Sequence, residues 1–199
     1  MTMPFILASS SETRANMLRA AGLSVEIAPA RVDEAAIKAA LLAEGAPARD
    51  IADALAEAKA RRIGQKRPDA IVLGADQVLV CNDVLFDKPD TIEMARDQLE
   101  RLRGQRHVLL SAAVIFHEGR PIWRHIGRAE LVMRDFSDSF LEDYLGREGS
   151  NLFATVGAYR LEYRGAQLFT SVAGDYFSIL GLPLLELLDF LRARKICQQ

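Results

Sequence analysis

The residues that could do chemistry begin near the start of the chain. An apolar run that ends at Ala8 is followed by Ser9, Ser10 and Ser11, and a helical pattern begins directly after the serines. Either Ser10 or Ser11 can cap this helix, because a serine hydroxyl accepts a hydrogen bond from an unpaired N–H group of the first turn. Together with Arg14, the hydroxyls and N–H groups predict a site for an anion, most naturally a phosphate. The alternative is an ordinary capped helix with a surface arginine.

A carboxylate and an amide stand together in the run Val72-Leu73-Gly74-Ala75-Asp76-Gln77-Val78. We expect the apolar strand to end at Gly74, which places Asp76 and Gln77 at its carboxyl end, where open α/β sheets bind ligands. There Asp76 can bind a hard cation such as Mg²⁺ or take a proton from water. The alternative is an aspartate that fixes the turn between two strands of a hairpin.

Two lysines and a second carboxylate could complete such a site. Lys59 lies in a helical segment at a position that can face inward, and Lys88 precedes Pro89 on a stiff turn. From that turn Lys88 either reaches a phosphate or is solvated. Glu34 is either a charge that favours the start of a helix or a second metal ligand.

The composition narrows the class of protein. The 199 residues are 50% hydrophobic, so the chain can bury a sizeable core, and the net charge of −2 favours neither nucleic acid nor an anionic membrane surface. Cys81 and Cys197 lie far apart, which argues against a zinc site or a disulfide framework. No basic leader followed by an apolar run and no long apolar stretch is present, so we expect a cytoplasmic protein without a membrane span.

Strand and helix patterns alternate along the chain. The expected strands are Pro4–Ser9, Ser24–Ala28, Ala70–Gly74, Gln77–Cys81, His107–Phe116, Ile122–Met133, Asn151–Glu162 and Ala166–Val172. The expected helices are Glu12–Ala21, Glu34–Glu44, Asp50–Gln65, Ile92–Arg103, Ser137–Gly146 and Leu184–Lys195. This order predicts an α/β fold around one curved mixed sheet with flanking helices. The last helix is too apolar for a surface, so it should pack against the sheet or a partner chain.

Several segments in a fixed order closely resemble the Maf family of nucleoside triphosphate pyrophosphatases. They are Leu7-Ala8-Ser9-Ser10-Ser11 with Arg14, Val32-Asp33-Glu34, Glu57-Ala58-Lys59-Ala60, Gly74-Ala75-Asp76-Gln77-Val78, Lys88-Pro89, Leu102-Arg103-Gly104 with His107, Gly157-Ala158-Tyr159 and Gly181-Leu182-Pro183-Leu184. The resemblance runs from Ile6 to about Arg192. It implies one domain over residues 1–199, with two lobes around a cleft, similar to inosine-triphosphate pyrophosphatases. It also implies a divalent cation, Mg²⁺ or Mn²⁺, and a homodimer.

The resemblance also implies roles for single residues. Asp76 would be the catalytic carboxylate that orients or deprotonates a water for attack at the α-phosphorus, and Asp76 and Glu34 would be the metal ligands. The substrate-binding residues would be Ser9, Ser10, Ser11, Arg14, Lys59 and Lys88. The specificity residues would be Thr13, Gln77 and Glu162. The products would be a nucleoside monophosphate and diphosphate.

Three departures from the family pattern bear on the substrate. The usual Ser-Pro-Arg-Arg is replaced by a segment with one arginine fewer, and a late lysine is absent where Ala154-Thr155-Val156 precede Gly157. Gln77 and Glu162 look more like the branch that hydrolyses 7-methyl-GTP than the branch that hydrolyses dTTP and UTP. A dTTP/UTP pyrophosphatase, a non-catalytic nucleotide-binding regulator of cell division and a scaffold that binds through its last helix remain alternatives. The absence of GxxxxGK[ST] and GxGxxG motifs argues against a P-loop nucleotidase and a dinucleotide oxidoreductase.

Overall fold

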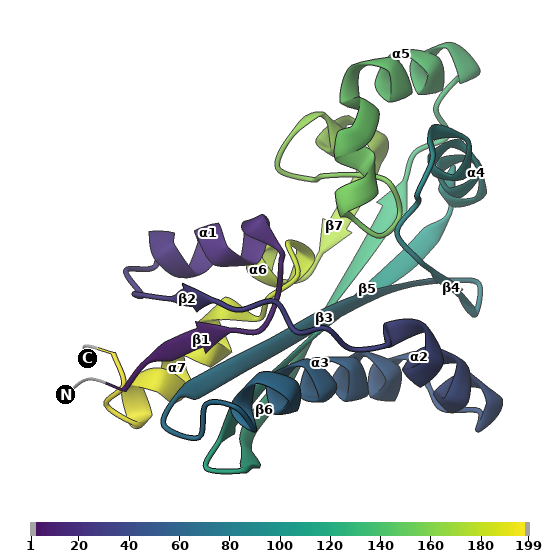
Figure 1. Ribbon diagram of the computed structural model, residues 1–199. Coiled ribbons are helices and arrows are strands. Elements are labelled where there is room, and N and C mark those ends of the chain that lie inside the picture. Colours follow the sequence, from purple (N-terminus) through teal and green to yellow (C-terminus); the bar gives the residue numbers. More distant parts are fainter. Residues whose placement is uncertain (1–2, 198–199) are drawn as a thin grey trace. The chain divides into compact units, whose positions relative to one another are not determined.

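The computed structural model describes residues 3–197, which form two compact units. Unit 1 contains the chain up to Gln77, Leu110–Gly127 and the chain from Tyr176 on, and unit 2 contains Val78–Leu109 and Arg128–Asp175. Strands β3 (Ile71–Cys81), β5 (Arg106–His117) and β6 (Arg120–Met133) contribute to both. The strands form an open mixed sheet in the order β2 (Glu26–Ile27), β1 (Phe5–Leu7), β3, β5, β6 and β7 (Phe169–Ala173), with β4 (Val84–Phe86) paired to β3. The expected α/β fold with one mixed sheet is therefore confirmed (Figure 1).

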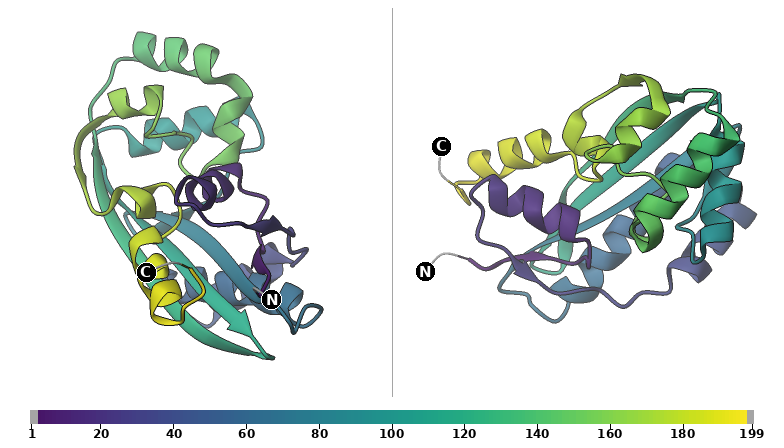
Figure 2. Two further views of the ribbon diagram at one scale, coloured as in Figure 1. Left: turned by 90° about the vertical axis from the view of Figure 1, so that its left-hand side faces the viewer. Right: turned by 90° about the horizontal axis from the view of Figure 1, so that it is seen from above.

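The sheet of unit 1 is parallel at its N-terminal edge. Strand β1 (Phe5–Leu7) pairs with β2 (Glu26–Ile27) on one side and with β3 on the other, so that Leu7 lies between Ile27 and Leu73. Strands β5 and β6 are long neighbouring strands of the sheet (Figure 2). The two residues of the turn between them, Glu118 and Gly119, both have positive φ. Such turns match the right-handed twist of the strands that they connect.

The helices of unit 1 begin largely where the sequence predicts. They are α1 (Glu12–Ala20), α2 (Glu34–Ala43), α3 (Ala48–Gly64), the short α6 (Tyr176–Ile179) and α7 (Leu184–Ala193). The side chain of Ser11 accepts a hydrogen bond from the N–H group of Arg14, and that of Asp33 accepts one from Ala36. Ser11 is therefore the cap of α1, and Glu34 is the first residue of α2. Helix α6 has no counterpart among the expected elements.

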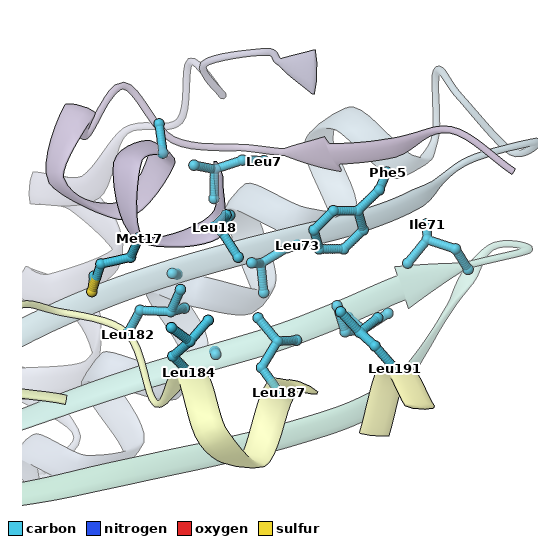
Figure 3. Close-up of a cluster of buried hydrophobic side chains, with 14 residues drawn as sticks. Phe5, Leu7, Met17, Leu18, Ile71, Leu73, Leu182, Leu184, Leu187 and Leu191 are labelled. Atoms are coloured by element: carbon cyan, nitrogen blue, oxygen red, sulfur yellow. The ribbon is translucent and has the colours of Figure 1, made fainter. Parts of the chain in front are cut away.

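Helices α1 and α7 share one face of the unit 1 sheet. Leu18 of α1 and Leu184, Leu187 and Leu191 of α7 are buried with Leu7, Leu73 and other residues of the strands. Figure 3 shows the side chains of the two helices pointing toward one another over the strands. The apolar last helix thus covers the sheet, as one of the two expected alternatives requires. Burial of each such leucine contributes roughly 1.5–3 kcal/mol.

Helix α3 packs close to β3 because Gly74 has no side chain. A Cβ at Gly74 would lie 2.1 Å from the carbonyl oxygen of Ala56 and 2.8 Å from the Cβ of Ala60. The expectation that the strand ends at Gly74 is therefore wrong: this glycine is a packing contact inside an 11-residue strand. Asp76 consequently lies within β3, neither in a hairpin turn nor at a strand end.

Unit 2 combines the remaining parts of the long strands with helices of its own. Its further elements are β4 (Val84–Phe86), α4 (Ile92–Leu102), α5 (Asp138–Glu148), the 3-10 helices Gly149–Ala154 and Arg164–Leu168, and β7 (Phe169–Ala173). Strand β7 pairs antiparallel with β6, and β4 pairs antiparallel with β3. Leu99, Leu102, Leu141 and Tyr144 are buried and give this unit its own core.

The expected strand Asn151–Glu162 does not exist. The segment contains a 3-10 turn followed by turns, with positive φ at Gly157 and Ala158. Leu152 is completely buried and Val156 nearly so. These side chains are buried from turns, so their spacing along the chain does not indicate a strand. Between residues 3 and 197 no helix has the length and apolarity needed to cross a membrane.

Candidate active site

The serines after β1 form hydrogen bonds at the start of α1. The hydroxyl of Ser9 accepts hydrogen bonds from the N–H group of Ser11 at 3.2 Å and from Nη1 of Arg14 at 3.3 Å. Ser9 is buried and Ser10 is exposed, while Ser11 caps the helix. Thr13, on the first turn of α1, is partly buried. The N–H groups of this turn carry the positive end of the helix dipole, which favours an anion.

Arg14 is a buried cation fixed from two sides. Its Nε donates a 2.7 Å hydrogen bond to the carbonyl oxygen of Gly181, in addition to the contact with Ser9. Burial lowers the pKa of Arg14, while the negative charges of Asp76 and Glu34 act in the opposite direction. The alternative that Arg14 is a surface arginine is wrong, because this residue is only 9% exposed. A guanidinium held in this way keeps its remaining N–H donors in a fixed orientation.

Lys59 brings two carboxylates together. Its Nζ lies 2.6 Å from Oδ1 of Asp76 and 3.0 Å from Oε1 of Glu34. Lys59 and Asp76 are both 8% exposed, whereas the Glu34 side chain is about half exposed. The close packing of α3 on β3 puts the ammonium over Asp76, and the start of α2 adds Glu34. Two opposite charges that are both buried stabilise each other only in such close geometry.

The charged residues of unit 1 that the sequence singled out as site residues therefore form one group. We call Arg14, Glu34, Lys59 and Asp76 the charged cluster. Its formal charges sum to zero, with two cations facing two carboxylates. Glu57 and Arg61 form a separate ion pair on α3 that contributes nothing to this cluster.

Gln77 follows Asp76 but points to the other face of the strand, since successive side chains alternate. Its Nε2 donates to the hydroxyl of Ser111 at 2.9 Å, to the carbonyl of Ser178 at 3.2 Å and to that of Ile179 at 3.0 Å. Sequence reasoning missed Ser111, which is fully buried in β5. A single serine inside the apolar run of that strand was the available signal.

Two predicted residues belong to unit 2. Lys88 is exposed shortly after β4, and Glu162 is partly buried in a turn before the second 3-10 helix. The structure does not test their roles in phosphate binding and base selection, which stay predictions. His107, part of the resemblance without an assigned role, is buried with its Nε2 2.8 Å from the hydroxyl of Tyr159.

The residues present fit a divalent cation whose remaining ligands come from a bound phosphate compound. Residues 3–197 contain no group of three or more histidine, cysteine, aspartate or glutamate side chains that could hold a metal ion. Glu34 and Asp76 nevertheless converge on the same ammonium. Mg²⁺ commonly binds one or two carboxylates and takes its other ligands from phosphate oxygens and water. The two carboxylates therefore suit such a cation, but only together with bound phosphates.

Comparisons with known proteins identify the family of the chain. The family described as Maf-like protein matches residues 4–194. A protein of Ruegeria pomeroyi is 53% identical over 196 residues, covering 98% of each chain, and one of Roseobacter denitrificans is 54% identical over 194 residues, again covering 98% of each. A protein of Caulobacter vibrioides is 51% identical over 189 residues, 95% of this chain and 94% of its own. All three carry the name nucleoside triphosphate pyrophosphatase. The chain belongs to the Maf-like protein family.

Proposed function

We propose that the protein hydrolyses nucleoside triphosphates to a nucleoside monophosphate and diphosphate. The observation that carries this proposal is the charged cluster, in which a buried carboxylate, Asp76, lies beside two fixed cations. The names of the relatives that share about half of its residues support the same reaction.

The chemistry follows from the charges of unit 1. The phosphate chain is strongly negative, and Arg14 and Lys59 offset that charge where it develops during bond cleavage. Asp76 orients a water molecule for attack at the α-phosphorus and accepts its proton. For this, the carboxylate must exchange part of its contact with Lys59 for the water. The bond between the α-phosphorus and the bridging oxygen breaks, and diphosphate leaves with that oxygen.

Glu34 and Asp76 would hold a divalent cation that helps to neutralise the phosphate chain. When bound by Glu34 and Asp76, Mg²⁺ or Mn²⁺ would supply positive charge to the phosphate oxygens. Both carboxylates contact Lys59 in the structure. When they bind a cation instead, the ammonium of Lys59 would pair with the phosphate chain. Lys88 is proposed as a further phosphate ligand on the strength of the sequence resemblance.

We further propose a preference for guanine-type bases, with 7-methyl-GTP hydrolysed better than dTTP or UTP. A carboxylate such as Glu162 accepts hydrogen bonds from the N1–H and amino groups of guanine, which pyrimidines do not match. The positive charge of 7-methylguanine adds attraction to that carboxylate. One or two hydrogen bonds of this kind support a discrimination of roughly 10–100-fold. The homodimer implied by the resemblance is also a proposal, which light scattering of the purified protein tests.

A panel of nucleoside triphosphates tests both levels of the proposal. Canonical and 7-methylated triphosphates are incubated with Mg²⁺ or Mn²⁺, and diphosphate and orthophosphate are measured separately. We expect diphosphate and the monophosphate, with the largest kcat/KM for 7-methyl-GTP. Release of orthophosphate and a nucleoside diphosphate contradicts the reaction. Best hydrolysis of dTTP or UTP contradicts only the base preference.

A further inference from the structure

The turn after α6 is fixed by a network of buried hydrogen bonds in unit 1. The carbonyl oxygen of Ser178 accepts hydrogen bonds from Ser111 Oγ at 2.6 Å, from Gln77 Nε2 at 3.2 Å and from the N–H group of Gly181 at 3.1 Å. Gln77 also donates to the carbonyl of Ile179. Side chains from two neighbouring strands thus hold the last residues of a four-residue helix that has few internal hydrogen bonds of its own.

The orientation of the Gln77 amide is set by its neighbours. The carbonyl oxygens of Ser178 and Ile179 can only accept hydrogen bonds, so the NH₂ group must face them. Both N–H groups of this side chain are therefore engaged within the protein. The donors of Gln77 serve the α6 turn and are not available to a nucleobase.

The turn after α6 is also packed tightly, so that two glycines beside it leave no room for a side chain. A Cβ at Gly127 would lie 2.2 Å from Oγ of Ser178, so that glycine makes room for α6. Gly181 has a φ of +102°, and a Cβ there would lie 3.2 Å from Nη2 of Arg14. A side chain at Gly181 would therefore both strain the backbone and press on the guanidinium.

The carbonyl group of Gly181 connects this network to the charged cluster, because it accepts the 2.7 Å hydrogen bond from Nε of Arg14. We propose that Ser111 and Gln77 are positioning residues that hold the Arg14 guanidinium in place through the α6 turn and the carbonyl oxygen of Gly181. Ser111 is fully buried, so its contribution cannot come from contact with the substrate. The proposal rests on the proposed function in that Arg14 binds the phosphate chain.

The role predicts an effect that is independent of the base. When Ser111→Ala removes one donor to Ser178 and one acceptor for Gln77, Arg14 loses its fixed position and every phosphate chain binds less well. We expect KM to rise about 3–10-fold for all nucleoside triphosphates, the range that one or two hydrogen bonds give, while kcat changes less. The dissociation constant of inorganic tripolyphosphate, measured by calorimetry, should rise by the same factor. Ile115→Val, a buried truncation in the same strand, is the matched control and should leave both constants unchanged.

Two further variants keep the test decisive. Gln77→Met has a similar shape without N–H donors, and it should give the same base-independent loss. In an Arg14→Lys background, which lacks the Nε donor, Ser111→Ala should cause no additional loss of tripolyphosphate affinity. An additive loss in that background overturns the proposal, as does a loss confined to one nucleobase or an unchanged affinity in Ser111→Ala. Circular dichroism and thermal unfolding confirm that each variant is folded.

The positioning role and the proposed function can fail separately. If the unaltered protein releases diphosphate from no nucleoside triphosphate, the proposed function is wrong, and the tripolyphosphate measurements still decide the role of Ser111 and Gln77. If the unaltered protein does not bind tripolyphosphate, Arg14 is not a phosphate ligand and the positioning role is also wrong.

Discussion

The two units bury different kinds of polar group. Unit 1 buries formal charges, Arg14, Lys59 and Asp76, in one cluster. Unit 2 buries a neutral pair, in which Nε2 of His107 lies 2.8 Å from the hydroxyl of Tyr159. Burial lowers the pKa of His107 to about 4 and raises the pKa of Tyr159, so both groups are uncharged near neutral pH.

The difference indicates that the buried charges of unit 1 serve catalysis and that the buried polar groups of unit 2 serve the fold. Burying several charges costs free energy that a folded protein could avoid with apolar side chains of similar size. A cluster that retains them has a use for the charge, and two cations beside two carboxylates suit a metal–triphosphate complex. The main buried charge of unit 2, Glu148, is neutralised by Arg160 at 2.8 Å. The contact within that pair and the contact between His107 and Tyr159 fix the fold of unit 2.

The largest effect is expected at Asp76. Asp76→Asn keeps the size of the side chain but removes the charge that accepts a proton and binds a cation. We expect turnover to fall on the order of 10²-fold or more. The control is Asp53→Asn, which removes a carboxylate of α3 that pairs with Arg124 and is not part of the charged cluster. Loss of turnover in Asp53→Asn alone, or near-normal turnover in Asp76→Asn, contradicts a catalytic role for Asp76.

The next effect is expected at Lys59. Lys59→Met keeps the aliphatic stem but leaves Asp76 and Glu34 without their shared ammonium. We expect kcat/KM to fall about 10–100-fold, because one preorganised charge near the phosphates is lost. Lys66→Met, at an exposed position just after the end of α3, should leave kcat/KM unchanged. Equal losses in both variants would indicate a general effect of net charge rather than a local one.

A smaller effect is expected for the choice of base. Glu162→Gln introduces the residue that the resemblance links to the dTTP/UTP branch. We expect the ratio of kcat/KM for 7-methyl-GTP to that for dTTP to fall by about tenfold. Gln77→Thr is measured beside it and should leave the ratio unchanged, because the Gln77 donors serve the α6 turn. If Glu162→Gln alone leaves the ratio unchanged, the base is not selected by this carboxylate.

The smallest effect on turnover is expected in unit 2, at His107. Its folded-state pKa of about 4 lies below the ordinary value of 6.5, so the unfolded chain takes up the proton first as the pH falls. The stabilising contribution is complete above pH 6.5 and is lost as the pH falls to 4, with a total of about 3 kcal/mol.

Urea unfolding at several pH values measures this loss. In His107→Gln, which does not titrate, the free energy of unfolding should depend less on pH between 6.5 and 4. Its kcat at pH 7 should stay within about twofold of the unaltered protein, since surface or structural changes outside the cluster do not alter the reacting groups. An equally steep pH dependence in His107→Gln would show that another group is responsible.

Much of unit 1 could be predicted from the sequence because its signals are local. The serine cap of α1 and the start of α2 at Glu34 follow from short-range hydrogen bonds. Gly74 could not be interpreted in this way, because its role depends on the approach of α3, which is distant in the sequence. A glycine that ends a strand and a glycine that admits a helix are identical in a single sequence.

Unit 2 was harder to predict for a similar reason. Leu152 and Val156 are apolar and closely spaced, yet positive φ values at Gly157 and Ala158 turn the chain, so the segment forms no strand. The charged cluster could be proposed from residue types, but Ser111 and the carbonyl of Gly181 could not. A backbone oxygen has no signature in the sequence, and a lone serine in an apolar strand does not reveal its partner.

The most direct test of the central claim follows the oxygen of the attacking water. The protein is given a nucleoside triphosphate and Mg²⁺ in ¹⁸O-labelled water, and the products are analysed by mass spectrometry after a single turnover. If Asp76 directs water to the α-phosphorus, the label appears in the nucleoside monophosphate and the diphosphate carries none. Label in the diphosphate, or in free orthophosphate, would contradict the account.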